Sequence, residues 1–425
     1  MKYRYRLNMN QNLSSKQKSL LSVLNVVHRN HPISRSEIGK KIGLTSVTVS
    51  TIVSQLLDLG ILKIVGEGDS KGGRRPFLID LVPSAFYLAA VDVGITKIIA
   101  TITDWYGNFI RSMRIESDLT LGEEHTINEM INLTKQLMTE VDPAIRDKVI
   151  GIGLSLPGIV DTDKGISVHS PGTLSISQSR DVPIASIFRK KFNIQTYIEN
   201  NARTMALAEI RYGTAKGYSN ICVINVGHGI GSGVIIDEEL YRGYALPSGG
   251  LGHLMVLPSG PRCHCGGRGC LESLAAGYAI AAAATRSFNM NEGSNIRKLV
   301  DGKIERVTAA VVSEAAQKGD ILATQIIIEA GHYLGLGIRS MISFINPEIV
   351  VLGGGVTKAG DLLLDEIKRT VNDHSISKRI KVPEIKFSEL GDNSSVIGAA
   401  AIALEDILVS AIDQSPIIQK IVHNS

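Results

Sequence analysis

The feature that most constrains the fold of this chain is a series of apolar, β-prone runs that each end in a glycine-rich turn. Four such segments follow one another: YLAAVDVGITKIIATITDW, VIGIGLSLPGIVD, ICVINVGHGIGSGVIID and EIVVLGGGVTKAGDLLLDEI. Apolar runs of this length bounded by glycine are typical of buried strands. Because glycine lacks a Cβ, such turns also let backbone N–H groups approach a phosphate closely. This part of the chain is therefore expected to be an α/β domain.

The N-terminal part has a different pattern, with apolar residues at helical spacing in the segments 14–30, 33–43 and 45–60. Ser34 has the capping-box spacing ahead of a glutamate, and Thr45 suits the N-cap of the third helix. Two β-prone runs follow, ILKIV and FLIDL, joined by the basic, glycine-rich turn GEGDSKGGRRP. Three helices followed by such a hairpin predict a winged helix-turn-helix.

Charge is divided unevenly along the 425 residues, a length at which more than one domain is expected. Residues 1–82 hold 13 Lys and Arg against 5 Asp and Glu, whereas residues 83–425 hold 32 against 36. A basic excess confined to one segment favours a DNA-binding domain over a helical protein-interaction module or an ordinary solvated surface. Small polar residues of the third helix and the basic wing are the expected contacts. The candidate DNA-binding residues are Ser34, Arg35, Thr45, Ser46, Thr48, Ser50, Thr51, Lys71, Arg74 and Arg75.

Three of the four cysteines lie together in CHCGGRGC, and the remaining one, Cys222, is expected in the core. Three thiolates and one imidazole make the Cys3His set that zinc favours in closed structural sites, with reduced thiols or a redox switch as alternatives. His253 and His264 compete for the fourth position. His264 lies on a short tether between two ligands, so His253, from a separate segment, is better placed. The expected zinc ligands are His253, Cys263, Cys265 and Cys270.

The order of these motifs resembles a known family. The glycine turns resemble the phosphate and adenosine segments of the actin-like ATPase and sugar-kinase fold, and SGGLGHLMVLPSGPRCHCGGRGCLES resembles the signature of the ROK family of repressors and sugar kinases. The resemblance covers essentially the whole chain. It implies a winged helix-turn-helix over residues 1–82 and a two-lobed, kinase-like α/β domain over residues 83–425. It also selects His253 as the fourth zinc ligand, and it implies sugar contacts from Gly158, Asn200, Asn201, His253 and Glu272.

Four positions depart from the kinases of this family. Asn201 stands where they have the aspartate that serves as catalytic base, and an amide can bind a sugar hydroxyl but cannot take its proton. Ile95 and His228 replace smaller residues of the two phosphate turns, and Gly250 replaces a sugar-binding glutamate. We therefore expect no catalytic residue and no kinase activity, with a sugar kinase, possibly bifunctional, as the alternative. The glycine at 250 leaves open weaker binding, a larger sugar, or no sugar ligand.

These observations predict a cytoplasmic, sugar-responsive transcriptional regulator, similar to the family branch that represses xylose or N-acetylglucosamine use. Its expected partners are operator DNA and a sugar that relieves repression, although a sugar that strengthens DNA binding is equally reasonable physically. One winged helix reads few base pairs, so a homodimer or a dimer of dimers is expected. No membrane partner is expected, because the apolar runs are interrupted short of the roughly 18 residues needed for a span.

Overall fold

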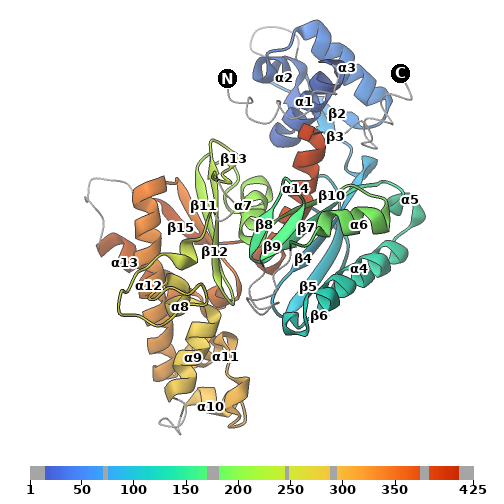
Figure 1. The fold of residues 1–425 in the computed structure, drawn as a ribbon. Helices are drawn as coiled ribbons and strands as arrows, with labels where there is room; N and C mark the ends of the chain where they lie inside the picture. Colours follow the sequence, from blue (N-terminus) through green and yellow to red (C-terminus); the bar gives the residue numbers. More distant parts are fainter. Residues whose placement is uncertain are drawn as a thin grey trace. The chain divides into compact units, whose positions relative to one another are not determined.

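The computed structural model shows a chain folded into two compact units, drawn as a ribbon in Figure 1. Unit 1 contains the residues up to Asn200 and those from Ala399 onward, and unit 2 runs from Asn201 to Gly398. The expected domain boundary after residue 82 falls inside unit 1 and stays a prediction. The residues described are 15–69, 75–169, 181–244, 248–287, 294–373 and 382–410.

The first part of unit 1 is the winged helix-turn-helix that the sequence predicts. Ser34 and Glu37 form a complete capping box at the start of α2, Gly43 ends that helix in the left-handed conformation, and Thr45 caps α3. The outer strand β2 pairs with β3, and β3 pairs with β1, all antiparallel. The elements are α1 (Ser15–Asn30), β1 (Ile33–Ser34), α2 (Arg35–Ile42), α3 (Ser46–Asp58), β2 (Leu62–Glu67) and β3 (Phe77–Leu81).

The rest of unit 1 is built on a five-stranded sheet with the order β10-β7-β4-β5-β6. The strands are β4 (Tyr87–Val93), β5 (Lys97–Thr103), β6 (Phe109–Glu116), β7 (Val149–Leu156) and β10 (Thr196–Asn200), and a small ribbon is formed by β8 (Ile159–Asp161) and β9 (Ile166–His169). The helical segments are η1 (Pro83–Ala85), η2 (Leu119–Leu121), α4 (Glu123–Glu140), α5 (Pro143–Arg146), α6 (Ile184–Phe192) and α14 (Ser394–Ser410), whose first turn belongs to unit 2.

Helices cover both faces of this sheet. Side chains of α4 and α6, including Leu133 and Phe188, share one buried cluster with Ile152 and Leu154 of β7. The glycines that alternate with these residues face the other way and pack against α14. A Cβ on Gly153 would lie 1.7 Å from a backbone oxygen of α14, so only glycine permits this close approach.

Unit 2 contains a second five-stranded sheet, with the order β13-β12-β11-β14-β15. Its strands are β11 (Ile221–Val226), β12 (Ile230–Ile236), β13 (Glu239–Leu240), β14 (Ile349–Gly353) and β15 (Glu384–Phe387). Its longer helices are α7 (Asn201–Tyr212), α8 (Leu271–Ala275), α9 (Gly277–Ser287), α10 (Asn295–Leu299), α11 (Ala309–Gln317), α12 (Ile321–Ile345) and α13 (Asp361–Asp373). Short helical turns are η3 (Leu251–His253), η5 (Ile304–Arg306), η6 (Gly355–Ala359) and η7 (Gly391–Asn393).

The two sheets share one topology. In unit 1, β4 pairs antiparallel with β5 and parallel with β7. In unit 2, β11 pairs antiparallel with β12 and parallel with β14. Each sheet therefore has a central strand whose hairpin turn lies beside the end of a parallel neighbour. The alternating strands and helices confirm the predicted α/β class.

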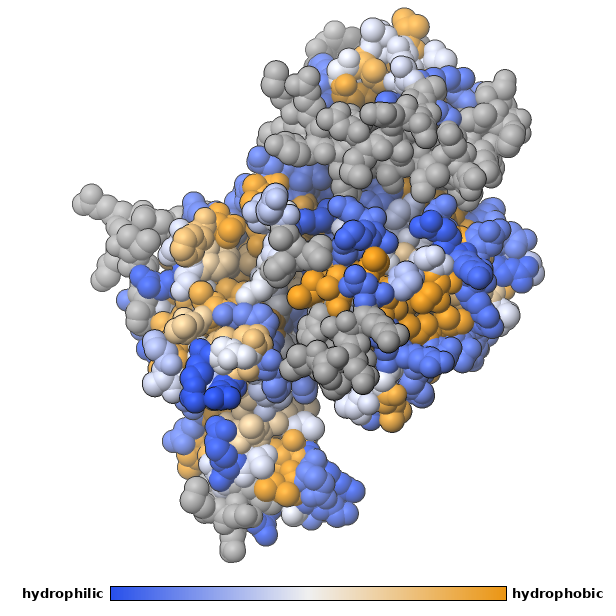
Figure 2. All heavy atoms as spheres, viewed as in Figure 1, coloured by the Kyte–Doolittle hydropathy of each residue, from blue (hydrophilic) through white to orange (hydrophobic). Residues whose placement is uncertain are grey.

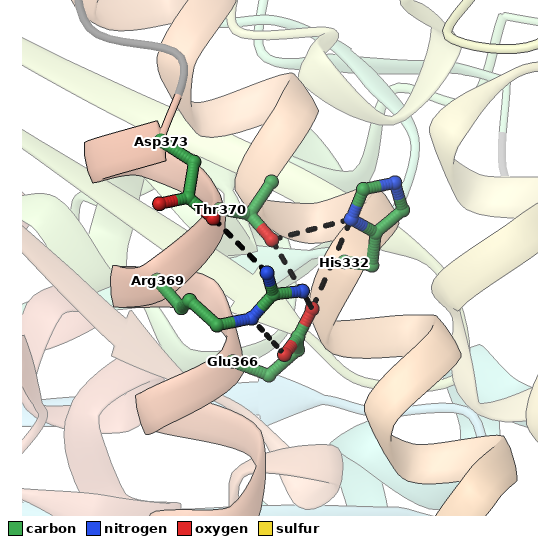
Figure 3. Close-up of polar contacts among 5 residues, drawn as sticks. All are labelled: His332, Glu366, Arg369, Thr370 and Asp373. Carbon is green, nitrogen blue, oxygen red and sulfur yellow. Dashed lines mark hydrogen bonds and ion pairs between the residues drawn. The ribbon is translucent and has the colours of Figure 1, made fainter.

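The helix α12 is the one helix of the described segments that is long and apolar enough to cross a membrane, and half of its most apolar window is buried inside unit 2. It packs against α13, where the carboxylate of Glu366 accepts two hydrogen bonds from Arg369 at 2.7 and 2.8 Å (Figure 3). His332 of α12 lies 3.2 Å from the hydroxyl of Thr370. A Cβ on Gly335 would lie 2.5 Å from that threonine, so glycine permits the close contact of the two helices.

Several contacts join the winged helix to the rest of unit 1, among them a hydrogen bond that the hydroxyl of Tyr106 donates to Asp80 of β3. The ring of His28 in α1 lies 2.9 Å from the carbonyl of Trp105, which is itself buried. Arg29 forms a 3.5 Å ion pair with Glu405 of α14, and both side chains are largely buried. The winged helix-turn-helix is therefore anchored by α14 and by the loop after β5. On the surface viewed in Figure 2, hydrophobic residues occur in several separate groups among hydrophilic ones.

Candidate functional site

The helix α3 presents a polar surface at its N-terminus, as the sequence predicts. Val49, Ile52, Val53 and Leu56 are buried against the rest of the winged helix. Thr45, Ser46 and Thr51 are exposed, and Thr48 and Ser50 are partly exposed. Small side chains at the start of a recognition helix leave room for a groove of DNA.

One residue of this surface was missed by the sequence reasoning. Val47 is 74% exposed, although it is apolar and lies between Ser46 and Thr48. Its signal was present in the sequence, because Val47 falls outside the buried stripe of α3. A branched apolar side chain at this place can contact a thymine methyl group.

The remaining DNA-binding candidates differ in their surroundings. Ser34 is buried and its hydroxyl is bonded within the capping box, so the structure corrects its assignment from a DNA contact to a helix cap. Arg35 is partly exposed and reaches Ser54 of α3 at 3.4 Å. Arg75 is exposed at the end of the wing. Two wing residues lie outside the described residues, namely Lys71 and Arg74.

The predicted metal ligands come together in unit 2. One donor atom from each of four residues lies within 4.8 Å of the other three. The Nδ1 atom of His253 lies 3.7 Å from the sulfur of Cys263, so this ring nitrogen faces the cysteines. The sulfurs of Cys265 and Cys270 are also 3.7 Å apart. We call His253, Cys263, Cys265 and Cys270 the metal cluster.

Glycines shape the loop that carries the three cysteines. Gly266 and Gly269 have positive φ angles of 90° and 65°. A Cβ on Gly269 would lie 1.6 Å from the carbonyl oxygen of Leu257, so this position accepts only glycine. The backbone N–H of Cys263 donates to the carbonyl of Gly267 at 2.9 Å, which closes the loop on itself. We call residues 263–270 the metal loop.

The thiols of this cluster lie in unlike surroundings. Burial raises the pKa of Cys263 to about 12, and burial also raises the pKa of Cys270. A hydrogen bond from the backbone of Gly267 lowers the pKa of Cys265, which is exposed. Zinc binds cysteine as the thiolate, and its charge would favour deprotonation of all three residues. Four donors of this kind leave no open position, so the set suits a structural ion.

The structure places His264 outside the metal cluster. Its ring lies 4.7 Å from the ring of Tyr278, which is also 5.7 Å from the ring of His228. Partial burial lowers the pKa of His228, so its ring is expected to be neutral at pH 7. Burial, followed by the charges of Glu272 and of the cysteines, raises the pKa of Tyr278. Sequence reasoning gave Tyr278 no role, because a lone tyrosine in a helix carries no motif.

The structure divides the expected sugar-contact residues between the two units. In unit 1, the side-chain amide of Asn200 donates to the carbonyl of Gly158 at 2.8 Å, and Gly158 has a φ of 81°. Asn201 begins α7 in unit 2, where its carbonyl accepts a 2.8 Å hydrogen bond from the hydroxyl of Thr204. The other two positions, His253 and Glu272, also belong to unit 2.

Glu272, an expected sugar contact, also makes contacts within the protein. Its Oε2 atom accepts a 2.9 Å hydrogen bond from the backbone N–H of Ile230, at the start of β12. Its Oε1 atom lies 4.0 Å from the sulfur of Cys263. A Cβ on Gly229 would lie 2.6 Å from the carboxylate, so this glycine makes room for it. Glu272 thus links the metal loop to residues 227–229, which we call the β11–β12 turn.

Arg203 is another residue that the sequence reasoning did not single out. It lies two positions after Asn201, it is buried, and its guanidinium donates to both the carbonyl and the hydroxyl oxygen of Ser248 at 3.0 Å. The segment that follows Ser248 leads through Gly250 to His253. A buried guanidinium therefore fixes the start of the segment in which the family glutamate is missing.

The first phosphate-like turn contains a buried carboxylate. Asp92 at the end of β4 accepts a 2.6 Å hydrogen bond from the hydroxyl of Ser155. Burial outweighs this bond and raises the pKa of Asp92 to about 6. Ile95 packs against the hydrophobic core of unit 1. The turn therefore carries a branched apolar side chain where the resemblance leads one to expect glycine.

Comparison with known proteins extends over nearly the whole chain. The model of the ROK family matches residues 88–406. The xylose repressor of Bacillus spizizenii is 31% identical over 388 residues, which cover 91% of this chain and 94% of that protein. The N-acetylglucosamine repressor of Escherichia coli is 29% identical over 404 residues, which cover 92% and 94%.

Two solved structures resemble the fold. A ROK family transcriptional regulator, a homologue of the Escherichia coli MLC protein, matches 96% of this chain with a TM-score of 0.78 and 24% identity, over 99% of its own length. A ROK family glucokinase from Streptomyces griseus, solved with glucose and AMPPNP, matches 75% of this chain with a TM-score of 0.68 and 26% identity, also over 99% of its length. The regulator thus accounts for more of this chain than the kinase does.

Proposed function

The chain belongs to the ROK family, and from that membership we propose that it is a sugar-responsive transcriptional repressor that lacks kinase activity. The observation that carries this proposal is the winged helix-turn-helix at the N-terminus, with a capped and polar α3, in front of a kinase-like domain. The relatives named as xylose and N-acetylglucosamine repressors span both parts of the chain. A sugar kinase needs only the second part.

The proposed DNA-binding surface consists of α3 and the wing. Ser46, Thr48 and Thr51 face the bases or phosphates, Val47 contacts an apolar base edge, and Arg75 reaches a phosphate. Two-fold operators match two-fold proteins, so the proposal includes a homodimer or a dimer of dimers in the cytoplasm.

The proposal that the protein lacks kinase activity rests on Asn201. Its amide stands at the position of the catalytic aspartate and cannot accept the proton of an attacking hydroxyl. The buried Asp92 supports the same view, because its carboxylate is already bonded to Ser155. Sugar binding without phosphorylation would leave the energy of binding available for shifting a conformational equilibrium.

We propose zinc as a structural ion in the metal cluster. The donor set of three cysteines and one histidine fits zinc, and the short distances among the donors support this assignment. His253, Cys263, Cys265 and Cys270 would hold the ion. When bound, the ion would supply a positive charge and a cross-link between the metal loop and η3.

The test of DNA binding starts from a duplex selected out of a random library by the full-length protein. Its dissociation constant is then measured over a range of salt concentrations. Arg75→Ala should weaken binding and reduce the salt slope by about 0.9, the value for one phosphate contact. Lys190→Ala, an exposed lysine on α6 outside the winged helix, serves as the control. Failure to select any duplex would contradict the repressor function.

The test of the ligand is a thermal-shift panel of monosaccharides, their phosphates and small oligosaccharides. A sugar that raises the melting temperature is then titrated against the selected duplex, and weaker DNA binding is the expected result. Stronger binding would reverse the proposed sign. Steady sugar-dependent consumption of ATP, abolished by Asn201→Ala, would instead establish the kinase alternative.

A further inference from the structure

Tyr278 lies between the metal loop and the β11–β12 turn, and the proposed function does not use it. Its ring contacts the ring of His264 from the metal loop and the ring of His228 from the turn. Its backbone is tied to the same turn, because the N–H of Gly277 donates to the carbonyl of Gly227 at 2.8 Å. Tyr278 is therefore fixed at the junction of these two segments.

The hydroxyl of Tyr278 is in an unusual state. Its oxygen is buried and makes no hydrogen bond of ordinary geometry among the described residues, although it lies near enough to the thiol of Cys263 for a contact between the two side chains to raise the pKa of the phenol. Buried hydroxyl groups nearly always have a partner, so an orphaned one calls for an explanation. The groups whose charges act on it most strongly are Glu272 and Cys263, followed by Cys270. The hydroxyl thus lies beside the buried side of the metal cluster.

Cys263 is the ligand that this hydroxyl can reach. Its side chain is buried, and a hydrogen bond from the backbone of Cys265 acts to lower the pKa of its thiol. A metal-bound thiolate keeps lone pairs that can accept a hydrogen bond, and a neutral phenol is a good donor. Its sulfur also lies 3.7 Å from Nδ1 of His253, a fellow ligand, and 4.0 Å from Glu272, which is acceptor-only when ionised.

We propose that Tyr278 donates a hydrogen bond to the thiolate of Cys263 when zinc is bound, and that it acts as a positioning residue of the metal cluster. This rests on the proposed metal centre and extends it. Through its ring and its helix, Tyr278 then couples the occupied metal cluster to the β11–β12 turn. Glu272 provides a second connection, from the same cysteine to Ile230. Partners in this outer position commonly fix the orientation of the ligands they contact.

The first experiment compares Tyr278→Phe with the matched variant Tyr333→Phe on α12. Both changes remove one hydroxyl from a partly buried tyrosine of unit 2, but Tyr333 lies beside Glu329 and not beside a cysteine. The zinc dissociation constant is measured by competition with a chromogenic chelator. Tyr278→Phe should weaken zinc binding about tenfold, the lower end of the effect of outer partners. Tyr333→Phe should leave it unchanged.

A spectroscopic measurement separates this role from a packing role. With cobalt in place of zinc, the thiolate-to-metal charge-transfer bands report the electron density on sulfur. Loss of a hydrogen bond to Cys263 should move these bands to lower energy in Tyr278→Phe and not in Tyr333→Phe. Uniform incorporation of 3-fluorotyrosine, which strengthens the phenol as a donor, should move them to higher energy, and this shift should vanish in the Tyr278→Phe background.

Hydrogen exchange tests the coupling to the turn. Amides of residues 227–231 should exchange faster after removal of zinc from the wild-type protein, and zinc-loaded Tyr278→Phe should show part of that increase. Wild-type zinc affinity together with unshifted cobalt bands in Tyr278→Phe would overturn the proposal while leaving the metal centre intact. A wild-type protein that binds neither ion would overturn both. The repressor function is tested separately, by DNA binding.

Discussion

The β4–β5 turn of unit 1 and the β11–β12 turn of unit 2 occupy the same position in two sheets of one topology, but they are held in different ways. In unit 1, the next-to-last residue of the central strand is Asp92, which pairs in register with Ser155 of the parallel neighbour and accepts its hydrogen bond. In unit 2, the corresponding residue is Asn225, which pairs in register with Gly353. Only the first turn has a carboxylate bonded within its own sheet.

The second turn is instead held from outside its sheet. Glu272 of α8 accepts the N–H of Ile230, Gly277 of α9 bonds to Gly227, and Tyr278 contacts His228. All three come from the chain just after the metal loop. The comparison teaches that two sheets of one topology can hold the same turn in two ways, with an acid of the sheet itself in unit 1 and with side-chain and backbone contacts from outside the sheet in unit 2. In consequence, the two turns should respond to different perturbations.

The largest effect is expected from removing a metal ligand. Cys263→Ser should reduce the zinc content from about one ion per chain to none, because three ligands hold the ion much less tightly than four. Native mass spectrometry measures the content. Hydrogen exchange should increase at the β11–β12 turn and stay unchanged at the β4–β5 turn. Cys222→Ala, a buried cysteine in β11, is the control that keeps its zinc.

The second largest effect is expected from Asp92 beside the β4–β5 turn. It is a change of protein stability with pH, not a loss of zinc. Because burial raises the pKa of Asp92 from 3.8 to about 6, the folded state binds this proton more tightly than the unfolded state does. Stability from this group is therefore full below pH 3.8 and is lost as the pH rises through about 6. The loss amounts to at most about 3 kcal/mol, at 1.36 kcal/mol per pKa unit.

Asp92→Asn removes that loss while keeping an oxygen that can accept from Ser155. Both proteins are unfolded with urea at pH 4, 5, 6 and 7. The free energy of unfolding of the variant, minus that of the wild type, should become more positive as the pH rises. The zinc content should not change. A constant difference between the two proteins from pH 4 to pH 7 would show that Asp92 does not titrate in this way.

The sequence predicted this architecture because local signals agreed with it. The capping box at Ser34 and the N-cap at Thr45 each act within a few residues, and both are confirmed. The metal cluster was also predictable, since three of its four ligands lie within eight residues. The α/β class followed from apolar runs bounded by glycine.

What the sequence could not predict depends on contacts between distant residues. The burial of Ser34, the bond from Ile230 to Glu272 and the position of Tyr278 arise only when separate segments pack together. Arg203 is a similar case, because its partner lies 45 positions along the chain. The ROK resemblance supplied the expected sugar-contact residues, but the hydrogen bonds that Asn200 and Glu272 make within the protein came from the structure.

A smaller effect is expected from making the second turn resemble the first. Asn225→Asp places a carboxylate where the neighbouring strand offers Gly353 rather than a serine. The oxygen of Asn225 lies against the backbone, since a Cβ on Gly354 would be 2.4 Å from it. Without a serine to donate to it, the new carboxylate should destabilise the protein by about 1–2 kcal/mol at pH 7 and less at pH 4. Urea unfolding at both pH values measures this.

The smallest effect is expected from neutralising Glu272 beside the second turn. Glu272→Gln keeps an oxygen that can accept the N–H of Ile230 but removes the negative charge, so the free energy of unfolding should fall by only about 1 kcal/mol. Zinc should still bind, because Glu272 is not one of the four donors. Glu329→Gln on α12, an exposed glutamate of the same unit, is the matched control. If Glu272→Gln lost its zinc as completely as Cys263→Ser, the carboxylate would be part of the metal cluster, and the two turns would differ by a metal ligand rather than by contacts from outside the sheet.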